Sequence, residues 1–327
     1  MGKPTLFVTL EHGHHLKSSS NKLDEKFDVH YWPHSRCLSH EEMRANVKGV
    51  FGIICTPSNI IDSEIIDAAG ENLRVIVTTS VGYDHLDVKT LKAKGIRIGY
   101  LNSPAEMTVT VAEHAIGLLF ATARRIANDH LALRKNVDFW NERLANNQRY
   151  TIWNSAIGII GCGKIGTAIM KRLLAFSPKK CFYSSREPKS EADAMGAEWR
   201  SVDDVCKNSD YIIVTAQLSE ETHHLINRAR IDSMKPSAIL INVARGGIVE
   251  EEALVEALQN KKIARAGLDV LEKEPIEPNN TLLSLDNVVV TPHAAFSSSV
   301  VWDRILDLTM ENILAVYENR EMPSELL

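Results

Sequence analysis

The chain has 327 residues, 44% of them hydrophobic and 24% charged, and its formal net charge is −5 at pH 7. This length and composition predict two globular domains with buried cores, and the absence of a basic excess argues against a nucleic-acid partner. Five cysteines with no CxxC pair argue against a disulfide framework or a zinc site, so we expect no metal centre and a reducing, cytoplasmic location.

Strand-like and helix-like patterns alternate in the first part of the chain. β-rich runs predict strands at residues 6–10, 27–31, 50–55, 74–78 and 96–100. Polar stretches with helical spacing predict helices at residues 62–69 and 88–94. This alternation predicts a parallel sheet with helices on both faces.

A long helical pattern follows at residues 104–134, and its centre is apolar on more than one side. A helix of this kind is buried on several faces. We therefore expect it to pack between domains or against a second subunit.

A second alternating block occupies most of the remaining chain. Strands are predicted at residues 156–160, 181–183, 211–214, 238–242, 264–269 and 288–291. Helices are predicted at residues 165–176, 202–207 and 250–259, and a last helix at 298–318. The two blocks predict two doubly wound domains, with the second inserted into the first and chain crossings near residues 101–103 and 293–297.

A glycine-rich turn follows the first strand of the second block. Gly161, Gly163 and Gly166 have the GxGxxG spacing, and the turn opens a helix. The first glycine permits a tight turn, the second a close approach to a pyrophosphate, and the third close packing of helix on strand. The pattern predicts a dinucleotide site whose loop also includes Cys162, Lys164 and Ile165.

The end of the next strand is expected to bind the adenosine ribose. Ser184 stands where an NAD enzyme usually has an acidic residue, and Ser185, Arg186 and Lys189 follow it. Without the acid a 2′-phosphate is not repelled, and the two cations can pair with it. This segment predicts a preference for NADP(H), with NAD(H) possible. The alternative is a solvated basic turn that excludes neither cofactor.

Three segments that follow predicted strands carry polar residues suited to catalysis. They contain Arg245 in INVARGGIV, Glu274 in AGLDVLEKEP and His293 in VVVTPHAAF. Taken singly, each is more often a surface or structural side chain than a catalytic one. Together they supply what reduction of a 2-oxo acid needs: a cation for the carboxylate, a proton donor, and a carboxylate that favours the charged imidazole. The two glycines after Arg245 are expected to let a ligand approach the backbone.

The ordered set GCGKIG, ARGG, LDVLEKEP and PHAAF resembles the D-isomer-specific 2-hydroxyacid dehydrogenases, and the resemblance covers nearly the whole chain. It implies a catalytic triad of Arg245, Glu274 and His293, with Asp269 facing the nicotinamide amide. The segment VGYDHLD resembles the family's substrate loop, so Val81 and Gly82 are expected to bind the substrate carboxylate alongside Arg245 and His293; the alternative is an ordinary strand-to-helix turn. The other cofactor-binding residues that the resemblance implies are Thr110, Gln217, Val243 and Ala295.

Within the family, SSREPK and EMPSEL resemble the glyoxylate/hydroxypyruvate reductase branch. That resemblance implies NADP(H)-dependent reduction of glyoxylate or hydroxypyruvate to glycolate or D-glycerate. After His293, however, the chain reads AAFSS where that branch usually reads IGSAT, and PHAAF is nearer to D-lactate dehydrogenases and dehydrogenase-like corepressors. The alternatives are another D-2-hydroxyacid dehydrogenase, acting on lactate-like or bulkier acids, and a dinucleotide-sensing scaffold.

The expected fold is α/β, with two doubly wound parallel-sheet domains. A Rossmann dinucleotide-binding domain, residues 103–294, is inserted into a flavodoxin-like substrate-binding domain, residues 1–102 and 295–327. The resemblance also implies a homodimer formed through the long helix, in which Phe139 or Trp140 reaches the partner's active site. The apolar runs are too short to cross a bilayer and the first residues lack a signal-peptide core, so we expect no membrane partner.

Several other residues are interpreted as non-functional. The segment EHGHH, residues 11–15, has no recognised metal-ligand spacing. His85 and His114 fall on helical patterns and are interpreted as packed or exposed side chains. Cys162 is interpreted as a small space-filling residue in the glycine loop and not as a redox switch.

Overall fold

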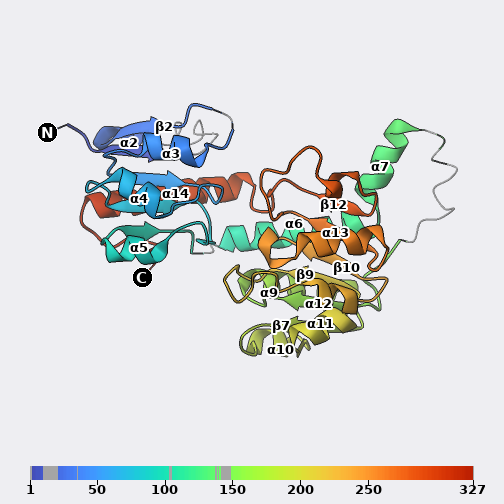
Figure 1. The fold of residues 1–327 in the computed structure, drawn as a ribbon. Helices are drawn as coiled ribbons and strands as arrows, with labels where there is room; N and C mark the ends of the chain where they lie inside the picture. The colour runs from blue at the N-terminus through green and yellow to red at the C-terminus, as the bar shows by residue number, and fades with distance from the viewer. Residues whose placement is uncertain are drawn as a thin grey trace. The chain divides into compact units, whose positions relative to one another are not determined.

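A computed structural model describes residues 2–9, 21–34, 36–102, 105–136, 138, 140 and 149–326. The chain forms two compact units, the first comprising Met1–Glu106 with Ser298–Leu327 and the second Met107–Ser297. Each unit contains one parallel sheet covered by helices on both faces (Figure 1). This arrangement confirms the expected fold class.

The first unit has a five-stranded sheet in the order β2-β1-β3-β4-β5, and every neighbouring pair is parallel. The central strands β3 and β4 are buried at every residue, which explains their continuous apolar sequences GIIC and VIVT. The strand order reverses between β1 and β3, as in flavodoxin-like sheets. The strands are β1 (Thr5–Val8), β2 (Asp28–Tyr31), β3 (Gly52–Cys55), β4 (Val75–Thr78) and β5 (Arg97–Gly99).

Helices cover both faces of this sheet. On one face the core includes Met43, Ile65 and Leu91, contributed by α3, α4 and α5. On the other face α14, drawn in red, returns from the end of the chain to the blue strands and buries Met310 and Ile313 (Figure 1). The helices are α2 (Asn21–Lys26), α3 (His40–Asn46), α4 (Ser63–Ala69), α5 (Val88–Ala93) and α14 (Ser299–Tyr317).

An ion pair ties the C-terminal segment to the edge strand β5. The Arg97 guanidinium donates to Glu325 through Nε at 2.8 Å and Nη2 at 2.5 Å, and the two side chains are 28% and 21% exposed. The Arg97 partner holds the pKa of the Glu325 carboxyl below its usual value. A bidentate pair of this kind is the stronger sort of surface ion pair.

The variant Glu325→Gln should lower the free energy of unfolding by about 1 kcal/mol at pH 7. Because the folded-state pKa of Glu325 is lowered, the stabilisation is present above the ordinary glutamate pKa of about 4.3 and is lost as the pH falls through the folded-state value. Urea unfolding at neutral and acid pH measures the difference. Glu321→Gln, an exposed change in the same segment, is the control; an equal effect of both variants would contradict the assignment.

The second unit has a seven-stranded parallel sheet in the order β12-β11-β10-β9-β6-β7-β8. The order reverses between β6 and β9, which is the switch point where doubly wound sheets bind ligands. The strands are β6 (Ala156–Ile160), β7 (Lys180–Ser184), β8 (Glu198–Trp199), β9 (Tyr211–Val214), β10 (Ile239–Asn242), β11 (Arg265–Leu268) and β12 (Val288–Val290).

Helices also cover this sheet on both faces. One core contains Val205, Ile231 and Leu254 from α11, α12 and α13. On β11 a Cβ added at Gly267 would lie 2.6 Å from Thr122 Oγ1, so α6 packs directly on this strand. The helices are α6 (Ala105–Ala123), α7 (Ile126–Lys135), α9 (Lys164–Leu173), α10 (Ser190–Ala194), α11 (Val202–Asn208), α12 (Arg228–Ser233) and α13 (Glu251–Gln259), with 3-10 turns η1 (Leu174–Phe176), η2 (Gly246–Ile248) and η3 (Thr281–Ser284).

The single helix predicted at residues 104–134 is wrong in one respect. The structure breaks it into α6 and α7 at Arg125, which has a left-handed φ of 59°. Arg125 donates to the Asp286 carbonyl at 3.2 Å and pairs with Asp129 at 3.5 Å. These contacts hold a conformation that arginine seldom adopts, and neither glycine nor proline marks the break in the sequence. Within the described residues, no helix has the length and apolar character needed to span a bilayer.

Candidate active site

Five strands of the second unit deliver the expected functional residues to one edge of its sheet. Parallel strands β6, β9, β10, β11 and β12 end at Ile160, Val214, Asn242, Leu268 and Val290, and their carboxyl ends share that edge. The residues that follow them include the glycine turn and the segments with Arg245, Glu274 and His293. The sequence positions are distant, but the topology places them on the same side of the unit.

The turn between β6 and α9 has the backbone that its glycines predict. Gly161 has φ +98°, and a Cβ there would lie 2.3 Å from the Ala216 nitrogen, so only glycine fits. A Cβ at Gly166 would lie 2.6 Å from the Gly161 oxygen, which explains the close packing of α9 on the turn. The Cys162 thiol is buried and burial raises its pKa, which favours its space-filling interpretation.

The N-terminus of α9 has the open backbone that an anionic group requires. Gly163 is its N-cap residue and has no side-chain capping bond, and a Cβ there would meet nothing within 4 Å. Lys164 and Ile165 form the first turn of this ten-residue helix. The first N–H groups of a helix and its dipole favour a phosphate at this position. The turn therefore fits the pyrophosphate of a dinucleotide.

The ribose end of the predicted site lies where β7 ends. Ser184 is buried, and its carbonyl accepts from Gly161 N at 2.9 Å, which joins this strand end to the glycine turn. The Ser185 hydroxyl donates to the Glu187 carbonyl at 2.6 Å. Arg186 and Lys189 are exposed. The strand end therefore presents a buried serine, with two exposed cations beyond it.

His293 and Glu274 are in direct contact. His293 Nδ1 lies 2.7 Å from Glu274 Oε2, and the side chains are 25% and 29% exposed. The other carboxylate oxygen, Glu274 Oε1, accepts from Leu271 N at 2.9 Å, which fixes the carboxylate. Because Nδ1 faces the carboxylate, Nε2 is the ring nitrogen that can serve a substrate. Phe296 lies edge-on to the imidazole, with ring centroids 6.3 Å apart.

Arg245 lies in a turn that packs against the loop carrying Glu274. Its carbonyl accepts from Asn242 Nδ2 at 2.9 Å, which orders the turn. A Cβ added at the next residue, Gly246, would lie 1.9 Å from the Leu271 carbonyl carbon. The expected role of this glycine is ligand access, but the structure shows that it permits contact between two backbone segments. Arg245 is half-buried beside the same loop that positions Glu274.

Asp269 is the most buried ionisable side chain of the predicted set. It accepts from Ala294 N and Ala295 N at 2.9 Å each and from Thr291 Oγ1 at 2.6 Å. Its backbone carbonyl accepts from His293 N at 2.8 Å. His293 itself has a left-handed φ of 51°. Asp269 therefore holds the turn in which His293 lies.

His114 is a contact of this network that sequence reasoning missed. It lies on α6, and its Nε2 is 3.1 Å from Asp269 Oδ1 and 3.1 Å from Thr291 Oγ1. The interpretation of His114 as a merely packed or exposed side chain is therefore incomplete. The only signal in the sequence was its place one helical turn after Thr110 on α6.

The remaining predicted residues follow strands β4, β9 and β10. Val81 and Gly82 follow β4 in the first unit, and the Gly82 carbonyl accepts from Ser80 Oγ at 2.6 Å. Gln217 is exposed after β9, and Val243 is buried after β10. The segment EHGHH and Phe139 lie outside the described residues.

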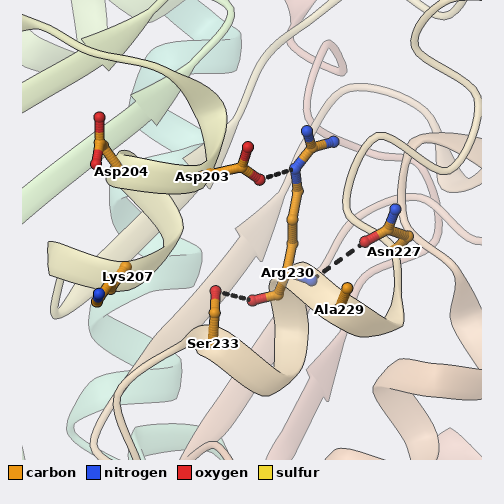
Figure 2. Close-up of a pocket in the computed structure, with 7 residues that line it drawn as sticks. All are labelled: Asp203, Asp204, Lys207, Asn227, Ala229, Arg230 and Ser233. Carbon is orange, nitrogen blue, oxygen red and sulfur yellow. Dashed lines mark hydrogen bonds and ion pairs between the residues drawn. The ribbon is translucent and has the colours of Figure 1, made fainter.

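A surface hollow of about 390 Å³ lies elsewhere on the second unit (Figure 2). Arg230 on α12 and Asp203 on α11 form an ion pair at 2.6 Å within it. It is lined by residues of these helices and of the turn before α12, and none of the predicted functional residues is among them. Its lining is Asp203, Asp204, Lys207, Asn227, Ala229, Arg230 and Ser233.

One group of side chains in the described part of the chain could hold a metal ion. His223, His224 and Glu272 place one ligand atom each within 4.8 Å of one another. The two imidazoles stack at 4.0 Å, and His224 Nε2 lies 2.6 Å from Glu272 Oε1. The His224–Glu272 contact joins the turn before α12 to the loop after β11. We therefore interpret the group as a structural contact.

Comparison with known proteins identifies relatives over the whole chain. Residues 116–295 match the NAD binding domain of the D-isomer specific 2-hydroxyacid dehydrogenases. Glyoxylate reductase of Pyrococcus furiosus is 36% identical over 330 residues, covering 99% of this chain and 95% of that protein. Human glyoxylate reductase/hydroxypyruvate reductase is 37% identical over 300 residues, covering 91% of this chain and 90% of that protein.

A solved structure of a reductase has the same fold as this chain. The NADPH-dependent glyoxylate/hydroxypyruvate reductase of Sinorhizobium meliloti, in complex with NADP and malonate, superposes with a TM-score of 0.83. It is 30% identical to this chain, and the match covers 99% of this chain and 97% of that one. The similarity extends to both parallel-sheet units.

Proposed function

The chain belongs to the D-isomer-specific 2-hydroxyacid dehydrogenases, and we propose that it reduces glyoxylate and hydroxypyruvate to glycolate and D-glycerate, with NADPH preferred. The observation that carries this proposal is the His293–Glu274 contact of 2.7 Å at the sheet edge that also bears the glycine turn. Relatives named glyoxylate reductase support the choice of substrate class.

The proposed chemistry assigns one role to each side chain. When bound, the reduced nicotinamide supplies the hydride that adds to C2 of the 2-oxo acid. His293 donates a proton from Nε2 to the carbonyl oxygen, while Glu274 orients the ring through Nδ1 and stabilises its charge. Arg245 binds the substrate carboxylate through its guanidinium. Val81 and Gly82 of the first unit remain the proposed amide donors to that carboxylate, with the first unit as the substrate-binding domain.

The cofactor preference rests on the segment after β7. Ser184, Arg186 and Lys189 are the residues proposed to bind a 2′-phosphate, and Lys189 N donates to Tyr183 Oη at 2.8 Å, which orders this loop. The reductase of Sinorhizobium meliloti is NADPH-dependent, which supports the proposal. NADH is proposed as a weaker alternative, because the Ser184 hydroxyl can still hydrogen-bond a 2′-hydroxyl.

Replacing both Arg186 and Lys189 with alanine should lower kcat/KM for NADPH by about 10–100-fold, because two charged contacts to a phosphate are removed. The value for NADH should change by about twofold or less. Steady-state assays with both cofactors measure the effect, and Lys207→Ala, an exposed lysine of the α11–α12 hollow, is the control. A wild-type enzyme that prefers NADH would contradict the proposed cofactor.

A substrate panel tests the proposed reaction. Glyoxylate, hydroxypyruvate, pyruvate and bulkier 2-oxo acids should be compared with NADPH and NADH, and the first two should give the highest kcat/KM. Ala295 and Phe296 after His293 make lactate-like or bulkier acids the second candidate. If pyruvate or a bulkier 2-oxo acid gives the highest kcat/KM, the proposed substrate is wrong. Negligible turnover with tight dinucleotide binding would instead favour a dinucleotide-sensing scaffold.

We also propose a cytoplasmic homodimer. Helix α7 buries none of its residues and exposes Ile126 and Leu131, which are 59% and 54% exposed. A helix with no buried residue and two exposed apolar side chains offers surface that a second copy could cover. All five cysteines are free thiols, which is consistent with a reducing compartment. Sedimentation equilibrium measures the mass, and a monomer at micromolar concentration would contradict the dimer.

A further inference from the structure

Both oxygens of the Asp269 carboxylate accept hydrogen bonds from neighbouring residues. Its side chain is fully buried, and both oxygens are occupied: Oδ2 by Ala295 N, and Oδ1 by Ala294 N and Thr291 Oγ1. A buried carboxylate is costly unless such donors compensate it. Burial raises the pKa of Asp269, and the hydrogen bonds that it accepts, first among them the one from His114, lower it by more, so the group is ionised.

His114 is the one side chain of this set that comes from a helix. Its Nε2 lies 3.1 Å from Asp269 Oδ1, and its side chain is 24% exposed. An ionised carboxylate has acceptors only, so Nε2 must carry the hydrogen and donate it. The Thr291 hydroxyl uses its own hydrogen for Asp269, which leaves its oxygen as a second acceptor for His114 at 3.1 Å.

The same carboxylate holds the two residues that follow His293. Ala294 N and Ala295 N both donate to it, and His293 N donates to the Asp269 carbonyl at 2.8 Å. His293 sits at a positive φ, a conformation that needs such support from its surroundings. Any rotation of the Asp269 side chain would release the two amides and loosen this turn.

We propose that His114 is a positioning residue, whose Nε2–H fixes the Asp269 carboxylate and through it the turn that presents His293 to the substrate. The role in turnover rests on the proposed function, whereas the role in holding the turn does not. His114 acts through Asp269 and touches neither the Glu274 carboxylate nor the His293 ring in the contacts described above.

Two substitutions separate the hydrogen bond from the packing of the ring. His114→Leu keeps an apolar bulk but has no donor, whereas His114→Gln places an amide N–H near the position of Nε2. His30→Leu is the matched control, because His30 Nε2 lies 3.1 Å from Asp28 Oδ2, the same separation, in an exposed pair of the first unit. Removal of a donor to a buried charge is expected to change the local equilibrium by about tenfold.

Amide hydrogen exchange of the protein without ligand tests the inference directly. The peptide containing Ala294 and Ala295 should exchange about tenfold faster in His114→Leu, and at nearly the wild-type rate in His114→Gln and His30→Leu. Faster exchange spread over the strands of the whole sheet would show general destabilisation and overturn the proposal. So would an unchanged peptide in His114→Leu, or a failure of glutamine to restore protection.

Steady-state kinetics test whether the hydrogen bond from His114 also affects turnover. In His114→Leu kcat should fall about tenfold while KM for the 2-oxo acid stays within about twofold, and His114→Gln should recover most of kcat. If KM rises and kcat does not fall, the residue does not act through His293. If the wild-type chain turns over no 2-oxo acid of the panel, the proposed function fails, and the exchange measurement still decides the role of His114.

Discussion

Replacing His293 with glutamine should lower kcat by about 10²–10⁴-fold, because proton transfer to the carbonyl oxygen is lost. Glutamine keeps a polar group at the position but cannot donate a proton and then recover it near neutral pH. The dissociation constant for NADPH should stay within about twofold, since the glycine turn and the loop after β7 are untouched. Single-turnover kinetics and fluorescence titration of NADPH measure the two quantities separately.

The control for this variant is His40→Gln in the first unit. His40 Nε2 lies 2.8 Å from Asp62 Oδ2 and forms a similar imidazole–carboxylate pair far from the proposed chemistry in sequence. Its replacement should leave kcat within about twofold. If His293→Gln instead weakens NADPH binding and spares the rate of the bound complex, His293 is a cofactor-binding residue and not the proton donor.

Eleven of the twelve strands in the described residues were predicted, and the two-residue edge strand β8 was missed. Continuous apolar runs such as YIIV of β9 and ILIN of β10 are too short for buried helices, and they alternate with helical patterns as parallel strands do. Helices α2, α3, α10 and α12 were not predicted, and each has only five to seven residues, so its periodicity is weak. Length alone does not decide, since the six-residue α5 was predicted. The break at Arg125 was also missed, since it depends on a distant partner, Asp286.

The proposed functional residues also fall into two groups, those whose conformation the local sequence predicts and those whose contacts depend on tertiary packing. Gly161 could be assigned from its neighbours, because the GxGxxG spacing encodes a local turn. The partnership of His114 with Asp269 could not, because it depends on how α6 packs on the end of β11, and one histidine in a helix carries no signal of its partner. Local backbone requirements are written in adjacent residues, whereas a side-chain network becomes visible only when the packing is known.

Replacing Gly246 with alanine should damage both stability and catalysis. The new Cβ would lie 1.9 Å from the Leu271 carbonyl carbon and 2.0 Å from its oxygen, so one backbone segment must move. Because the atoms in the way belong to the backbone, no flexible side chain can move aside to relieve the clash. We therefore expect the free energy of unfolding to fall by about 3 kcal/mol or more. Urea unfolding and steady-state kinetics of the purified variant measure the two effects.

The loss of activity should exceed what partial unfolding explains. Leu271 N donates to Glu274 Oε1 at 2.9 Å, and Glu274 in turn contacts His293, so a displaced Leu271 backbone would move the proposed catalytic carboxylate with it. A shift of about 1 Å in such a position lowers kcat about 10²-fold.

The adjacent glycine offers a closely matched control. A Cβ at Gly247 would meet nothing closer than 3.6 Å, so Gly247→Ala should change stability by about 0.5 kcal/mol or less. Equal behaviour of the two variants would show that the loop yields freely and that Gly246 is not needed for the contact. A large difference would mean that the first glycine after Arg245 is required because two loops of the site meet backbone to backbone, which is how the Arg245 turn is held beside Glu274.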